Sequence, residues 1–77
     1  MRTVVELLGA GFVRFEDRRI PTDTFLLEMR ERVRLADGEP SRLPAVHVRA
    51  DPDAPLGPID GFLQGLRTAG VRYVVLE

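Results

Sequence analysis

The sequence predicts an α+β fold, a two-layer α/β sandwich with both helices on one face of a mixed four-stranded sheet. The residues from Ala45 to Leu76 read as strand, helix and strand, and strands joined by a crossover helix lie parallel in one sheet. The first residues contain two β-rich runs around Gly9-Ala10-Gly11, which is typical of an antiparallel hairpin. The predicted order is therefore β-β-α-β-α-β, and it leaves room for one extra short strand.

The hairpin is predicted from alternation between apolar and polar side chains. Thr3–Leu8 and Phe12–Glu16 are rich in β-branched and aromatic residues, so both are expected to be strands. Residues 16–19 read as a polar turn. Ile20 is expected to be extended, because a residue that precedes proline avoids the helical region.

The first helix is expected to begin at Thr22 or Asp23, since either side chain can accept a hydrogen bond from the first turn. Gly38 is a natural end for it, and Pro40 prevents the helix from resuming. Four apolar residues at helical spacing predict the buried face. They are Leu26, Met29, Val33 and Ala36.

The predicted strand Ala45–Ala50 places Ala45, His47 and Arg49 on the face opposite to its valines. The second helix is expected to begin near Pro58 and to end at Gly70. The last strand then lies within Val71–Leu76. The buried stripe of this second helix is predicted to contain Ile59, Phe62, Leu63 and Leu66.

Composition restricts the classes of function. Seventy-seven residues predict one domain, residues 1–77, with a small core. The net charge of −1 argues against a nucleic-acid surface, since phosphate binding needs an uncompensated basic patch. The chain has no cysteine and no run of about 18 apolar residues, so neither a zinc–sulfur site nor a membrane span is expected in this segment.

Candidate chemistry is sparse, and we predict that the protein is not an enzyme and needs no metal or cofactor. Asp51 and Asp53 follow a strand, where sites of α/β units gather, yet two carboxylates in a loop are more typical of a turn before a helix. Ser41 is the only serine, and no general base lies near it in the sequence, so nucleophilic catalysis has no support. A small enzyme that uses Asp51, Asp53 and His47 is therefore the least supported hypothesis, after the binding module and the free-standing regulatory or ligand-binding domain described below.

The surface expected to contact a partner is formed by His47, Arg49 and Asp51. His47 is the only histidine and is expected on the outward face of a half-exposed strand. A short mixed sheet also has two open edges, and open edges recruit extended segments through main-chain hydrogen bonds. The sequence does not decide which edge is used.

From about Phe12 onward the chain resembles the C-terminal domain of the ExbD/TolR family. The resemblance lies in the run from His47 through Arg49-Ala50-Asp51, the loop 53–57, the helix after it, and Ala69-Gly70-Val71 before the final strand. No single residue is diagnostic, but order and spacing together are. The preceding hairpin and first helix match more loosely.

The resemblance implies a periplasmic module of a proton-driven, energy-transducing complex of the inner membrane. Family members dimerise, work with a channel subunit of ExbB/TolQ type, and engage a TonB-like protein or peptidoglycan. Their membrane helix with its embedded aspartate has no counterpart in this sequence, so we expect a piece of a longer, membrane-anchored protein. The alternative is a free-standing regulatory or ligand-binding domain of the same fold.

Overall fold

The computed structural model describes residues 2–9, 11–50 and 56–77. None of the helices in these segments is long and apolar enough to cross a membrane. The elements, in chain order, are β1 (Arg2–Gly9), β2 (Phe12–Phe15), β3 (Arg18–Pro21), α1 (Thr22–Ala36), a 3-10 turn η1 (Pro40–Arg42), β4 (Ala45–Arg49), α2 (Leu56–Thr68) and β5 (Tyr73–Leu76).

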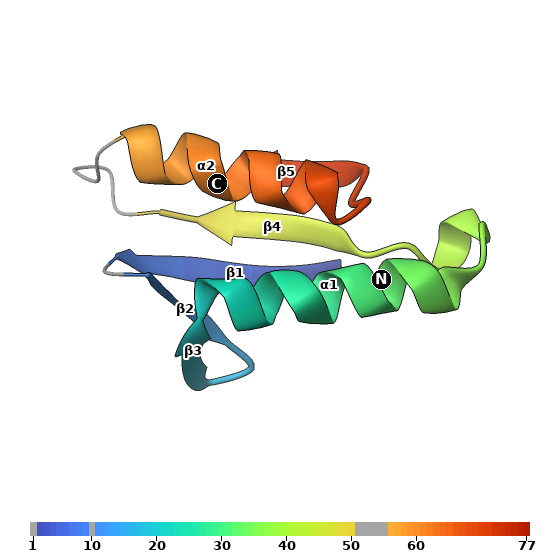
Figure 1. Ribbon diagram of the computed structural model, residues 1–77, viewed down its shortest axis with the longest axis horizontal. Coiled ribbons are helices and arrows are strands. Elements are labelled where there is room, and N and C mark those ends of the chain that lie inside the picture. The colour runs from blue at the N-terminus through green and yellow to red at the C-terminus, as the bar shows by residue number, and fades with distance from the viewer. Residues whose placement is uncertain (1, 10, 51–55) are drawn as a thin grey trace.

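The strands form one mixed sheet in the order β3-β2-β1-β4-β5. β1, β4 and β5 run parallel, whereas β2 pairs antiparallel with both β1 and β3. Figure 1 shows the β2–β3 hairpin at one margin of the sheet and β5 at the other. The predicted α+β class, the mixed sheet, the hairpin and the parallel strand–helix–strand unit are therefore confirmed.

The sheet has five strands, one more than the four predicted, and the prediction left room for one extra short strand without placing it. The additional one is β3, within the segment predicted as a polar turn followed by extended residues. Glu16 and Asp17 alone form the turn, with φ angles of 52° and 61°. Two successive residues with positive φ make the tight hairpin turn whose twist matches the strands, so Arg18 already pairs with Phe15.

The first helix begins at Thr22, as predicted, but the predicted side-chain cap is wrong. Pro21 occupies the N-cap position, and no side chain there bonds to the first turn. Met29 and Ala36 are buried as expected, while Leu26 is only partly buried. Phe25 is fully buried and was missed, because the apolar stripe of the helix is wider than the predicted face.

Two further boundaries differ from the prediction. Helix α2 begins at Leu56, two residues before Pro58, and strand β5 begins only at Tyr73. Gly70 ends the helical segment with φ of 96°, and its N–H bonds to the carbonyl of Arg67. A left-handed residue just after a helix is the ordinary way to satisfy its last carbonyl groups.

Both helices cover the same face of the sheet. The Phe25 ring of α1 meets Phe15 of β2 edge-on, with centroids 5.1 Å apart, and stacks on Phe62 of α2 at 5.9 Å. Val46 and Val48 of β4 lie in the same core with no exposed surface. Each apolar side chain buried in this way stabilises the fold by roughly 1.5–3 kcal/mol before entropy is counted. No helix formed by the described residues lies over the opposite face of the sheet.

Candidate partner-binding surface

His47 and Arg49 project from β4 on the uncovered face of the sheet, as the alternation predicted. His47 is half-buried and Arg49 is exposed, while Val46 and Val48 between and beside them face the core. Asp51, the third residue expected at this surface, lies outside the described residues, as does Asp53. Two of the three predicted contact residues are therefore brought together by one strand.

The structure adds Glu77 to this pair. One of its carboxylate oxygens, Oε1, lies 3.0 Å from His47 Nδ1, and the other accepts a hydrogen bond from Arg49 Nε at 3.0 Å. Arg2 Nη2 approaches the same Oε1 at 3.9 Å. The hydrogen bond from Arg49, aided by His47, holds the pKa of the Glu77 carboxyl below its usual range.

Apolar side chains border this polar cluster on the same face. Val4 pairs with His47, and His47 pairs with Val75, so the three lie in one row across β1, β4 and β5. Val75 is 45 % exposed and Tyr73 is 51 % exposed. The uncovered face of the sheet therefore carries exposed apolar side chains next to the polar cluster around Glu77.

The two margins of the sheet differ in chemistry. The edge strand β3 carries Arg18, Arg19 and Pro21, and the Arg19 guanidinium lies 4.3 Å from the ring centroid of Phe12. Charges and proline on an edge strand discourage pairing with another chain. β5, in contrast, is Tyr-Val-Val-Leu and has no charged residue.

The backbone of β5 also presents unused hydrogen-bonding groups. The N–H of Glu77 bonds to the carbonyl of Val48 in β4, at 2.9 Å. Backbone groups of successive residues in a strand point to alternate sides, so those of Val74 and Leu76 point away from β4. No strand lies on that side within the described part of the chain.

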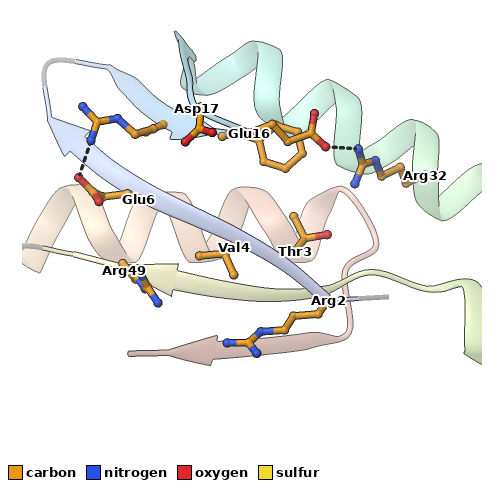
Figure 2. Close-up of a pocket in the computed structure, with 10 residues that line it drawn as sticks. Arg2, Thr3, Val4, Glu6, Glu16, Asp17, Arg32 and Arg49 are labelled. Carbon is orange, nitrogen blue, oxygen red and sulfur yellow. Dashed lines mark ion pairs between the residues drawn. The ribbon is translucent and has the colours of Figure 1, made fainter.

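A cavity of about 540 Å³ opens on the side of β1 that faces away from β4, between the first residues of β1 and the Glu16–Asp17 turn (Figure 2). Its ten lining residues include four arginines and three carboxylates. Sequence reasoning missed this cavity, since it forms only because β2 ends before the first residues of β1 are reached. Within residues 2–9, 11–50 and 56–77, no three carboxylates or histidines gather as metal ligands would.

Comparison with known proteins adds no relative. A search against protein-family models finds no match, and a search of curated protein sequences finds no significant match. Function is therefore inferred from the geometry of the surfaces and from the resemblance described above.

Proposed function

We propose that this domain is the periplasmic binding and dimerisation module of an ExbD/TolR-like, proton-driven energy-transducing complex. In this proposal the full-length protein is anchored to the inner membrane and works with a channel subunit of ExbB/TolQ type. The domain pairs with a second copy and engages a TonB-like protein or peptidoglycan. It acts by binding and is not an enzyme.

The observation that carries this proposal is the free edge of β5. Its outward N–H and C=O groups at Val74 and Leu76 can pair with one extended segment of another chain. Main-chain pairing demands little of side-chain identity, which suits a domain whose described residues hold no conspicuous catalytic cluster. The charged, proline-bearing β3 makes the opposite edge a poor competitor.

The surface beside this edge favours a partner that also covers part of the open sheet face. The exposed side chains of Tyr73 and Val75 project next to the edge and supply apolar area. The polar cluster of Glu77, His47 and Arg49 lies on β4 and just after β5, and it supplies polar contacts beside this apolar area. An apolar centre with a polar rim is the usual anatomy of a protein–protein interface.

Leu76→Pro tests the proposal directly, since proline removes the outward N–H of an edge strand without removing a bond inside the sheet. We expect the wild-type chain to dimerise as its concentration rises, and the proline variant to stay monomeric in sedimentation equilibrium. Leu76→Ala is the matched control. It removes the side chain but keeps the N–H, and it should weaken the dimer without abolishing it.

The proline variant must keep its fold for this comparison to decide. Its circular dichroism spectrum should match that of the wild type, because β5 remains bonded to β4 through Tyr73, Val75 and Glu77. A folded Leu76→Pro variant that dimerises as tightly as the wild type would contradict the proposal. So would a wild-type chain that stays monomeric and binds neither an extended peptide nor peptidoglycan.

A further inference from the structure

The cavity beside β1 lies at a break in the middle of the sheet, which we name the β1 notch. β1 pairs with β4 from Arg2 to Glu6, but on its other side β2 ends at Phe15, opposite Val5. The stretch from Arg2 to Val4 therefore has a strand on one side only. The notch is bounded by this stretch, the Glu16–Asp17 turn and Arg32 of α1, as Figure 2 shows.

The backbone of Val4 faces this notch. Phe15 and Arg18 flank a two-residue turn, so they bond to each other, and Arg14 consequently bonds across to Glu6. The groups of Val4 point to the same side as those of Glu6, two residues further along. No hydrogen bond joins Val4 to the Glu16–Asp17 turn in the described part of the chain. Its N–H and C=O are therefore available to a ligand.

Thr3 supplies a second unsatisfied group. Thr3 lines the cavity and is only 3 % exposed. Its hydroxyl oxygen, Oγ1, has no hydrogen-bond partner among the described residues. A buried hydroxyl without a partner costs about 1–3 kcal/mol of stability, so native structures hold few of them. A ligand in the notch that accepts a hydrogen bond from this hydroxyl would remove that cost.

Arg32 supplies a fixed positive charge. Its side chain is 23 % exposed, its guanidinium carbon lies 5.2 Å from the ring centroid of Phe15, and its Nε is 3.4 Å from Glu28. Its Nη2 lies 3.7 Å from the exposed carboxylate of Glu16, which is beyond hydrogen-bond distance. The Glu16 carboxylate therefore lies near the Arg32 guanidinium without forming a hydrogen bond to it, so another carboxylate could take its place.

We propose that the β1 notch binds a short extended peptide that carries a carboxylate. Its main chain donates to and accepts from Val4, while its carboxylate displaces Glu16 from Arg32 and accepts a hydrogen bond from the Thr3 hydroxyl. A simple anion would satisfy Arg32 and Thr3 but would leave the carbonyl of Val4 without a donor. The open stretch of three residues spans about 10 Å, enough for a tripeptide.

This site is separate from the edge of β5. The notch lies on the side of β1 that faces β2, so β1 itself and β4 stand between the notch and β5. It does not rest on the function proposed above. The two sites can therefore be tested independently on one protein, through amide signals that belong to different strands.

Titration of the ¹⁵N-labelled chain with acetyl-triglycine, followed by NMR, tests the inference. The peptide should shift the amide signals of Thr3 and Val4 and the side-chain signal of Arg32, and any shift at Val74 and Leu76 should not depend on whether the peptide carries a carboxylate. The C-terminal amide of the same peptide should bind about tenfold more weakly, as expected when a hydrogen bond to a charged group is lost. Acetate serves as the probe for an anion alone.

Two substitutions separate binding from folding. Thr3→Val should lower the affinity for acetyl-triglycine while raising the melting temperature, because it removes a buried hydroxyl that is unsatisfied in the free protein. Glu16→Gln should tighten binding, because it removes the competing carboxylate. Absence of shifts at Val4, equal binding of acetate and acetyl-triglycine, or affinities unchanged by both substitutions would each overturn the proposal.

Discussion

Glu77 shows how a single side chain links three strands. It lies just after β5. Its carboxylate accepts a hydrogen bond from Arg49 of β4 and lies 3.9 Å from the guanidinium of Arg2 in β1. Nothing in the sequence near Glu77 signals these contacts, because they depend on strand order and register. His47 and Arg49 could be assigned to one face by alternation, whereas their shared carboxylate partner could not.

The ionisation of Glu77 should make stability depend on pH. Because its pKa is lower in the folded state, the ionised carboxylate stabilises the fold above the pKa of the unfolded chain, about 4.3, and this stabilisation is lost as pH falls through the folded pKa. Urea unfolding should therefore show the wild type more stable than Glu77→Gln near neutral pH. The difference should vanish once the pH lies below the pKa of the carboxyl in the folded state.

Salt provides the control for this prediction. The carboxylate is exposed enough for its attraction to Arg49 to be screened, so about 1 M salt should shrink the difference at neutral pH. A gap between wild type and Glu77→Gln that grows on acidification would contradict the assigned role.

Strand β3 shows why one element was missed at the sequence level. Short hairpin turns are usually recognised by Asn-Gly or Asp-Gly, because both central residues take positive φ. Here the turn is Glu16-Asp17, which lacks this signal, so the sequence predicts a polar turn of four residues instead of two. The strand–helix–strand unit was predictable because proline, glycine and apolar periodicity all agree there. The β1 notch was not, since it depends on where β2 ends against β1.

Asp17→Gly should stabilise the hairpin. Asp17 has φ of 61°, a conformation that glycine adopts without the penalty that a side chain incurs. We expect the free energy of unfolding to rise by about 1 kcal/mol in chemical denaturation. Asp17→Ala is the control, because alanine keeps the penalty and should give no gain. A less stable glycine variant would argue against this turn geometry.

The whole molecule presents one covered and one uncovered sheet face, with margins of opposite character. The helices and the core valines protect the interior, and β3 is protected by charge and proline. No strand among the described residues pairs with the outer edge of β5. In the proposed function this asymmetry directs strand pairing to a single edge, so we expect a second copy or an extended partner to join at β5 and to leave the β1 notch accessible.

Amide hydrogen exchange, measured residue by residue over a range of protein concentrations, tests the role of β5 most directly. The outward N–H groups of Val74 and Leu76 should exchange rapidly in dilute solution and become protected as the chain self-associates or binds an extended partner peptide. The amides of β3 should not change. Protection that appears along β3, or amides of Val74 and Leu76 that stay fast under every condition, would contradict the account.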